Sequence, residues 1–340
     1  MNNTTTTTSC QPFPAEPHRC TVILNIRHAM ASISLISCIF CLFIIWVFRK
    51  YENFAQRLIA WLTIAALFDS IAYVMGDLQD SVTPFCRAQA FFLSYFDWAS
   101  LLWVCCITFN LYWNVIHFKA TKSFEIVYHI ICWVIPLIVA SIPFAKSDGY
   151  GPAGLWCWIT NKYTVMRFLL WYVPVWIAAV GLAIVYIYIR WKLKQQVGSW
   201  EGTYTPENQR MKELLREDIS DLKYYPLVYL IISLFPTINR IQNAVTPGES
   251  YVYPLLILHT LFSPLQGFLN AIVFTFDKDT RSRLALHQLW AALRSRFSER
   301  HSVKPYSVGS SAPPANERSL LHESAASSVS PVSSGDDTGT

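Results

Sequence analysis

Residues 29–48 read AMASISLISCIFCLFIIWVF, an apolar run that contains no Asp, Glu, Lys or Arg. An α-helix rises ~1.5 Å per residue, so about 20 apolar residues are needed to cross the hydrocarbon core of a bilayer. Charged residues follow the run directly, at Arg49 and Lys50. The stretch therefore predicts a membrane-spanning helix that ends near residue 48.

Further apolar runs follow, separated by charged or turn-rich segments. The seven runs cover 29–48, 58–78, 87–114, 125–145, 164–189, 222–243 and 252–276. The sixth is the weakest, because polar residues interrupt it at 233, 237, 239 and 240. Prolines inside several runs do not argue against helices, since neighbouring groups in a membrane protein can satisfy the freed carbonyls. We predict an all-α membrane protein, a seven-transmembrane helix bundle.

The composition supports a membrane protein. Hydrophobic residues make up 53% and charged residues only 14% of the 340-residue chain. An average soluble domain carries ~25% charged residues. A soluble chain of this length would form roughly two domains and need a charged surface over both. The modest net charge of +5 gives no reason to expect a nucleic-acid partner.

The Lys and Arg residues predict the orientation, because cytoplasmic segments of membrane proteins are enriched in them. With the N-terminus outside and the C-terminus inside, 20 of the 27 Lys and Arg residues fall on the inner side. We predict a multi-pass protein of the plasma membrane. Asn2 and Asn3 each begin an Asn-x-Thr sequon, so we expect glycosylation there unless the transferase misses so short a tail.

Four parts follow from these patterns: an extracellular tail 1–28, a receptor domain 29–276, a segment 277–298 and a cytoplasmic tail 299–340. The third part predicts an amphipathic helix on the inner leaflet, with membrane lipid as its partner. Its apolar residues recur at helical spacing, at Leu286, Leu289, Trp290, Leu293 and Phe297. The last part is rich in Ser, Pro and Gly, which predicts disorder.

Four of the nine cysteines stand outside the apolar interior, at positions 10, 20, 86 and 157. Cys86 opens the third run and Cys157 lies in the second outer loop, so both face the oxidising side. We predict a disulfide between them, the alternative being two unpaired thiols. A second bridge between Cys10 and Cys20 is a further hypothesis.

Polar residues inside the runs are candidates for function, because each is costly in lipid. Asp69 lies midway in the second run and Asn270 in the seventh, while Asn110 and Tyr112 lie at the inner end of the third. We expect these four residues to form an activation network. In the alternative, Asp69 and Asn270 make purely structural contacts between helices.

Two arginines lie at the outer ends of neighbouring runs. Arg167 begins the fifth run and Arg240 ends the sixth. Two guanidiniums in one outer cavity would suit a phosphate or carboxylate, so we expect a small anionic ligand there, with Asp97 or His259 deeper. In the alternatives, both arginines extend to lipid headgroups, or the loop acids at 148 and 249 pair with them.

Catalytic motifs are absent from the sequence. It contains no Walker A loop, no GxSxG, no HExxH and no paired Cys/His zinc spacing, and its eight His residues are scattered. We therefore expect neither an enzyme nor a bound cofactor or metal.

Several short motifs together are typical of one receptor family. They are ICWVIPL at 131–137, WCWI at 156–159, RF at 167–168, YVP at 172–174, NRI at 239–241, LHT at 258–260 and QG at 266–267. Over about 25–300 the chain resembles the cyclic-AMP-receptor-like (class E) family of seven-transmembrane G protein-coupled receptors, and more distantly the vertebrate orphan called G-protein coupled receptor 157. The rhodopsin-like Asp-Arg-Tyr is absent, and Asn110-Leu111-Tyr112 stands in its place.

The resemblance implies a receptor that transmits an extracellular ligand signal to a heterotrimeric G protein. It does not by itself imply cyclic AMP as the ligand, since related receptors in other lineages carry the family name without that ligand. A seven-helix transporter or channel is the alternative, although no internal repeat is visible in the sequence. A membrane scaffold without a ligand is a second rival.

Overall fold

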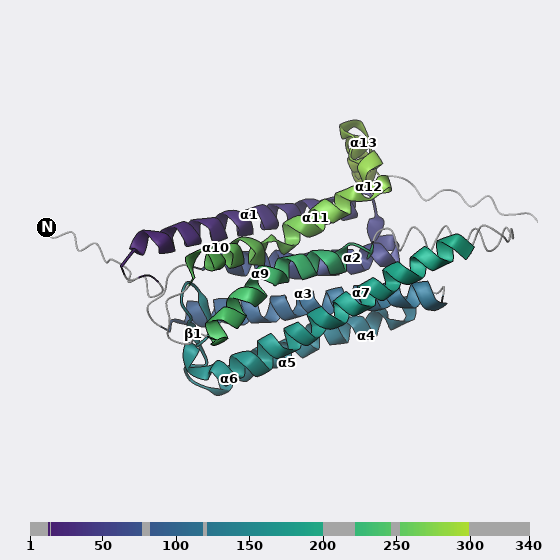
Figure 1. Ribbon diagram of the computed structural model, residues 1–340. Helices are drawn as coiled ribbons and strands as arrows, with labels where there is room; N and C mark the ends of the chain where they lie inside the picture. The colour runs from purple at the N-terminus through teal and green to yellow at the C-terminus, as the bar shows by residue number, and fades with distance from the viewer. Residues whose placement is uncertain are drawn as a thin grey trace, which may run out of the picture. The chain divides into compact units, whose positions relative to one another are not determined.

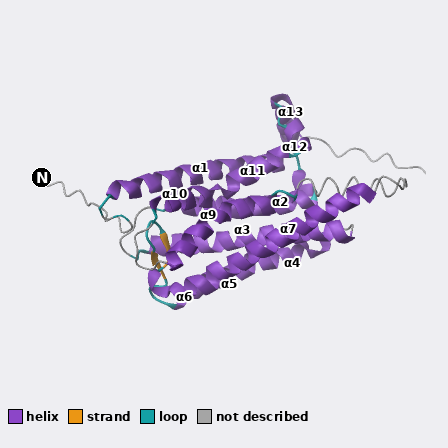
Figure 2. Ribbon diagram, in the orientation of Figure 1, coloured by secondary structure: helices purple, strands orange, loops and turns teal. Residues whose placement is uncertain are grey.

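The structure is a computed structural model that describes residue 13 and residues 15–76, 82–117, 121–199, 222–245 and 252–298. The chain divides into two units, Met1–Leu293 and Arg294–Thr340. The first unit holds a bundle of long helices that run side by side, with a short strand pair at one end (Figure 1; Figure 2). Of the second unit, only the last residues of helix α13 (Leu286–Ser298) are described.

The helices follow the predicted runs, with shifted ends. The elements before α13 are α1 (Pro17–Val47), η1 (Lys50–Glu52), α2 (Phe54–Val74), α3 (Pro84–His117), η2 (Lys122–Phe124), α4 (Glu125–His129), η3 (Ile130–Val134), α5 (Ile135–Ser141), η4 (Ile142–Ala145), η5 (Asn161–Tyr163), α6 (Thr164–Arg167), η6 (Phe168–Tyr172), α7 (Val173–Ser199), α9 (Tyr225–Val245), α10 (Tyr253–Phe262), η8 (Ser263–Leu265), α11 (Gln266–Phe276) and α12 (Lys278–Arg283).

Six helical stretches in the described part of the chain are long and apolar enough to cross a membrane. They are Pro17–Val47, Phe54–Val74, Pro84–His117, Lys122–Ala145, Asn161–Lys192 and Tyr253–Phe276. The chain is therefore a multi-pass, helical membrane protein. Helix α9 fills the sixth predicted run but is not one of these six, and that run is the one that polar residues interrupt.

Exposed apolar side chains lie where a bilayer would contact them. On α7, Ile177, Val180, Ile184 and Ile187 recur at helical spacing and are all exposed. In water such a stripe would be an aggregation hazard, but in a bilayer it faces hydrocarbon. The exposure of this face agrees with the assignment of Asn161–Lys192 as a span.

Helix α1 begins at Pro17, inside the segment 1–28 that the sequence analysis assigned to a tail. Proline suits a first helical position, because its fixed φ is compatible with the helix and its missing N–H has no partner there anyway. One side of the added turns is buried, at Cys20, Ile23 and Arg27. This burial stabilises helical turns that hydropathy alone did not reveal.

Helix α3 lies at the centre of the bundle and packs against α2, α5, α7, α9 and both strands. Its buried side chains, among them Leu101, Trp103 and Ile107, belong to the main hydrophobic core. A helix with neighbours on several sides can carry polar groups from the core to each of them, and positions in the site below are therefore described relative to α3.

Two segments contain a π-helical turn that ends two residues before a proline. These turns are Ile130–Val134 before Pro136 and Phe168–Tyr172 before Pro174. Pro174 has no N–H for the carbonyl of Leu170, and Trp98 of α3 donates its indole N–H to that oxygen at 3.1 Å. Neighbouring helices thus satisfy freed carbonyls, as the sequence analysis assumed.

A short antiparallel hairpin, which the sequence analysis did not predict, lies between the fourth and fifth segments. Strand β1 (Tyr150–Pro152) pairs with β2 (Cys157–Ile159) in the register Tyr150–Ile159. The connecting turn contains Gly154 at φ 103°, a conformation that glycine adopts without strain. The end of the bundle that carries these strands is called the hairpin end below, and the other the opposite end.

The segment after α11 contains two helices, α12 and α13. Trp290 of α13 is 71% exposed, as an apolar side chain on a membrane-surface helix would be. Contact of this helix with lipid stays a prediction. The tail 299–340 and the sequons at Asn2 and Asn3 lie outside the described residues.

Gly267 allows α11 to approach α1 closely. A Cβ atom placed on Gly267 would lie 2.3 Å from the Cys38 sulfur and 2.5 Å from the Ser34 hydroxyl. Real Cβ atoms do not approach heavy atoms so closely, so any larger residue forces the two helices apart. Gly181 of α7 is the opposite case, with nothing within 4 Å of the same position.

We predict that Gly267→Ala destabilises the purified receptor by about 1–3 kcal/mol, as overpacking of a tight contact does. Gly181→Ala is the matched control and should leave the thermal midpoint unchanged or raise it slightly, because alanine favours a helix over glycine. Thermal unfolding of the two variants in the same detergent gives the comparison. Equal midpoints for both variants would contradict the close α1–α11 contact.

Candidate functional site

A cavity lies between the helices at the hairpin end. Its empty space is about 830 Å³, including solvent at its mouth. Its lining comes from α2, α3, η6, α7, α9, α10, η8, α11 and the hairpin. Seven aromatic rings line it: Tyr73, Trp156, Trp158, Trp171, Tyr172, Trp176 and Tyr229. Its polar lining residues are Asp97, Ser233, Thr237, Arg240, His259, Ser263 and Gln266. Cavities of this size with a few convergent polar groups are typical ligand sites.

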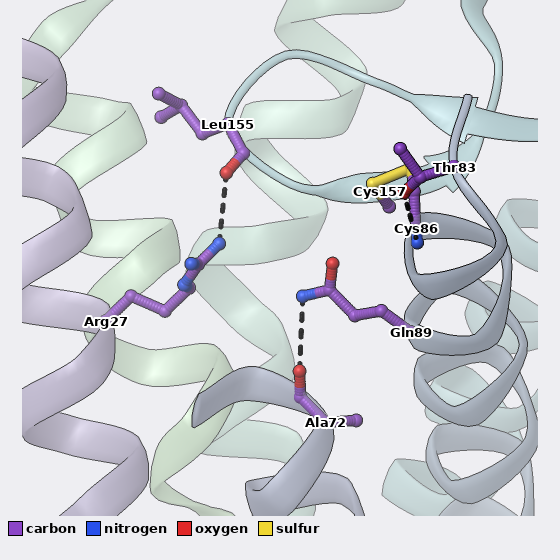
Figure 3. The surroundings of a disulfide bond; sticks show 7 residues. All are labelled: Arg27, Ala72, Thr83, Cys86, Gln89, Leu155 and Cys157. Atoms are coloured by element: carbon purple, nitrogen blue, oxygen red, sulfur yellow. Dashed lines mark hydrogen bonds between the residues drawn. A yellow bond between two sulfur atoms is a disulfide. The ribbon is translucent and has the colours of Figure 1, made fainter. Parts of the chain in front are cut away.

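The disulfide that the sequence predicts is present and holds the hairpin onto α3. Cys86 and Cys157 are bonded with their Cα atoms 5.3 Å apart (Figure 3). Trp158 follows in β2 and donates its indole N–H to the Ser94 hydroxyl at 3.1 Å. The disulfide and this hydrogen bond both join the hairpin to α3. They hold Trp156 and Trp158 at positions where both line the cavity. Cys20 is also disulfide-bonded, and its predicted partner at position 10 lies outside the described residues.

Arg27 of α1 holds the hairpin from another side, a role that the sequence analysis missed. Its side chain is 1% exposed and donates to the carbonyl of Leu155 at 3.0 Å (Figure 3) and to the carbonyl of Gly76. Beside it, Gln89 donates to the carbonyl of Ala72 at 3.2 Å. A single guanidinium therefore connects α1, the end of α2 and the turn of the hairpin.

Arg167 does not line the cavity. Its Nε donates to the carbonyl of Ile159 at 2.7 Å, and its guanidinium carbon lies 5.2 Å from the ring centre of Trp158. The side chain is only 9% exposed. Arg167 thus contacts the end of β2, and a contact of its guanidinium with a ligand stays a prediction.

The loop acid at position 148 does not pair with either arginine. Lys162 Nζ lies 2.7 Å and Tyr163 Oη 2.6 Å from the Asp148 carboxylate. Hydrogen bonds from Lys162 and Tyr163 lower the pKa of the Asp148 carboxyl to about 2. The second loop acid that the sequence analysis considered, at position 249, lies outside the described residues.

Arg240 of α9 lines the cavity and contacts aromatic rings. Its guanidinium carbon lies 5.5 Å from the ring centre of Trp156, 5.1 Å from Trp158 and 6.0 Å from Tyr172. Within the described part of the chain, Arg240 has no hydrogen bond and no carboxylate partner. Cation–π contacts position a guanidinium but leave its N–H donors available.

His259 of α10 lies beside Arg240 in the lining of the same cavity. Its Nδ1 is 2.8 Å from the amide nitrogen of Asn239, and its ring centre is 5.4 Å from that of Trp156. An amide N–H that donates to Nδ1 leaves Nε2 to carry the proton of the neutral ring. His259 therefore offers a donor in the half of the cavity near the hairpin.

Asp97 of α3 also lines the cavity, together with Tyr73 and Tyr229. No hydrogen bond or ion pair to Asp97 occurs among the residues that the structure describes. The structure thus brings Arg240, His259 and Asp97 to one cavity, three of the four residues that the sequence analysis assigned to the ligand.

The four residues of the predicted activation network lie at two levels. Asp69 and Asn270 are both 2% exposed in the middle of the bundle, and each has a side-chain atom without a partner in the described chain. At the opposite end, Asn110 Oδ1 accepts from the Thr121 hydroxyl at 2.7 Å. Tyr112 packs there against the ring of another tyrosine on α7. No hydrogen bond joins the side chains of the two levels within the described residues, so a single network stays a prediction.

Membrane-crossing helices around a cavity closed by a disulfide-linked hairpin are the organisation of a helical membrane receptor. A family model described as slime mold cyclic AMP receptor matches residues 18–296. The chain therefore belongs to this family of cyclic-AMP-receptor-like G protein-coupled receptors, as the motifs indicated. The family comprises receptors rather than enzymes, which confirms that expectation.

Curated relatives come from several kingdoms. The chain is 30% identical over 239 residues to cyclic AMP receptor-like protein A of Dictyostelium discoideum, covering 68% of this chain and 58% of that protein. It is 25% identical over 270 residues to G-protein coupled receptor 1 of Arabidopsis thaliana, covering 78% and 81%. It is 25% identical over 248 residues to G-protein coupled receptor 157 of Homo sapiens, covering 68% and 73%.

We predict that Arg27→Gln destabilises the receptor, because it leaves the buried carbonyl of Leu155 without its donor, at ~1–3 kcal/mol for an unpaired group. The carbonyl of Gly76 keeps His28 Nε2 at 2.8 Å. Arg87→Gln is the matched control: Arg87 is exposed at the same end and donates to the carbonyl of Ser147. Surface expression and the thermal midpoint of the two variants give the comparison. If both variants resemble the wild type, Arg27 does not hold the hairpin.

Proposed function

We propose that the chain is a plasma-membrane G protein-coupled receptor that binds an extracellular ligand in the cavity at the hairpin end. The hairpin end faces outside, where a disulfide persists, and the opposite end faces the cytoplasm and a heterotrimeric G protein. The lipid-exposed faces of the helices, the family and the inner excess of Lys and Arg support this arrangement.

In this proposal α9 is the sixth of seven spans. Its polar residues Ser233, Thr237 and Arg240 line the cavity. Its apolar residues on the other faces are exposed, at positions 231, 234, 238 and 241. A helix with a polar cavity face and an apolar lipid face scores low in mean hydropathy and still suits a bilayer.

The observation that carries the ligand proposal is Arg240. A guanidinium with free donors, placed between aromatic rings, suits an anionic group such as a phosphate or carboxylate. Cyclic AMP, which appears in the names of the slime-mould relatives, is one candidate that has such a group. Arg167 supports the pocket indirectly, since it bonds the end of β2.

At the opposite end, contacts between loops and helices favour the resting state of the proposed receptor. Lys50 Nζ lies 3.0 Å from Asp277 and 2.6 Å from the Thr280 hydroxyl. Burial opposes the charge of Asp277, but bonds from Thr280 and Lys50 lower the pKa of this carboxyl below its usual value. Arg57 and Glu125 form a two-pronged pair at 2.6 and 2.7 Å, joining α2 to α4. A ligand that favours another arrangement would shift the population away from these contacts.

We predict that Arg240→Gln lowers agonist potency by at least tenfold, because a charge-assisted bond of ~1.5–3 kcal/mol is lost. Surface expression should stay near that of the wild type, and Arg240→Lys should restore potency only in part, since lysine lacks the planar fork. The measurement is nucleotide exchange on an added heterotrimeric G protein, with cyclic AMP and a panel of small anions as agonists.

Arg167→Gln is the matched variant for this experiment. It should reduce surface expression rather than potency, because the carbonyl of Ile159 loses its donor while the cavity keeps Arg240. An unchanged dose–response curve for Arg240→Gln would contradict the anion site. A complete lack of exchange with membranes of the wild type would contradict the receptor itself and favour a transporter or channel.

A further inference from the structure

Resting on the proposed receptor function, we infer that the ligand is an elongated dipolar molecule, with an anionic group at Arg240, a protonated amine at Asp97 and a flat body between them. The observation behind this inference is that one cavity contains a guanidinium and a carboxylate, neither of which has a polar partner in the described chain. A ligand that is only an anion would satisfy the first group and leave the second unsatisfied.

The two charges do not neutralise each other. No contact within 4.0 Å joins Arg240 and Asp97 among the described residues. Charged groups inside a membrane protein are costly unless they are paired, and both of these line a cavity enclosed largely by aromatic rings. A purely anionic ligand would also be repelled by the Asp97 carboxylate, whereas a cationic group there would be attracted to it.

The two charges reach the cavity from different helices, Asp97 from α3 and Arg240 from α9. Asp97 is eleven residues beyond Cys86 on α3, which corresponds to about 16 Å along the helix axis. Arg240 packs on Trp156 and Trp158, which flank the cysteine that is bonded to Cys86. Trp158 in turn donates to Ser94, one turn before Asp97 on α3, and the guanidinium carbon of Arg240 lies 5.1 Å from the Trp158 ring centre. With one helical turn and one indole ring between them, the two charged groups are on the order of 10 Å apart. This is too long for a simple α-amino acid, whose charges are adjacent.

The aromatic walls of the cavity suit a flat, unsaturated body. Trp158 and Trp171 meet edge to face with ring centres 6.0 Å apart, and Tyr172 stacks on Trp176 at 6.0 Å. Such rings offer faces and edges for stacking. The rings of Tyr73 and Tyr229, which line the cavity with Asp97, can also contact an ammonium group.

A series of three compounds on one body tests this inference: 4′-(aminomethyl)biphenyl-4-carboxylate, biphenyl-4-carboxylate and 4-(aminomethyl)biphenyl. Binding to the purified full-length chain is measured by calorimetry. We expect the compound with both charges to bind at least tenfold more tightly than either singly charged compound. The shorter 4-(aminomethyl)benzoate should lose this advantage, because it cannot reach both groups.

Two substitutions test which residue binds each charged end of the dipolar compound. Asp97→Asn should remove the advantage of the dipolar compound over the carboxylate, and Arg240→Gln should remove its advantage over the amine. Asp148→Asn and Arg87→Gln change the same kinds of charge outside the cavity lining and should leave all preferences intact.

The inference is overturned if the carboxylate binds as tightly as the dipolar compound, if Asp97→Asn leaves the preference unchanged, or if none of the compounds binds. Ligand-free nucleotide exchange on an added G protein tests the receptor function separately. If the chain accelerates nucleotide exchange but does not prefer the dipolar compound, only this inference is rejected. If it prefers the dipolar compound but does not accelerate exchange, the receptor function is rejected and the inferred ligand class stands.

Discussion

The bond between Cys86 and Cys157 determines where the cavity can form, because it holds β2 against the first turns of α3. The two tryptophans that flank Cys157 then lie over the space between the helices and contact the guanidinium of Arg240. A covalent bond in a loop therefore influences the place of a charge on a different helix. Arg27 and Arg167 also help to hold the hairpin in place, since each donates a hydrogen bond to one of its backbone carbonyls.

The helical membrane fold could be predicted because its signal is local. Six of the seven runs reappear as helical stretches able to cross a membrane, since apolar composition over about 20 residues is visible without any knowledge of packing. Polar residues made the sixth run the weakest of the seven in the sequence, and the same residues indicate its role in the structure. Three of its four interrupting polar residues, Ser233, Thr237 and Arg240, line the cavity, and these residues lower the hydropathy that would identify the helix.

The contacts of the arginines could not be predicted, because each depends on which backbone carbonyl lies nearby in three dimensions. Arg167 and Arg240 have similar places at helix ends, yet one bonds the carbonyl of Ile159 and the other lines the cavity. Arg27 reaches a carbonyl 128 residues away. The spacing of apolar residues along the sequence does not reveal such contacts. The only sequence signal for Arg27 was an arginine shortly before an apolar run, which equally indicates a residue in a tail.

Helix α9 connects the cavity to the opposite end of the bundle, and Pro236 in its interior lines the cavity. Pro236 has no N–H for the carbonyl of Ile232, so the helix is weakest at the level of the cavity. Arg240 lies beyond the proline, and Tyr225 lies before it and lines a second cavity of about 310 Å³ at the opposite end.

A ligand changes an equilibrium only if it binds one arrangement more tightly than the other. A molecule that bonds Arg240 on α9 and Asp97 on α3 together meets that condition, because its affinity depends on the distance between the two helices. Under the proposed function, such a ligand acts on α9, the helix that carries Tyr225 to the second cavity. Asp277 lines the same cavity and accepts bonds there from Lys50 and Thr280.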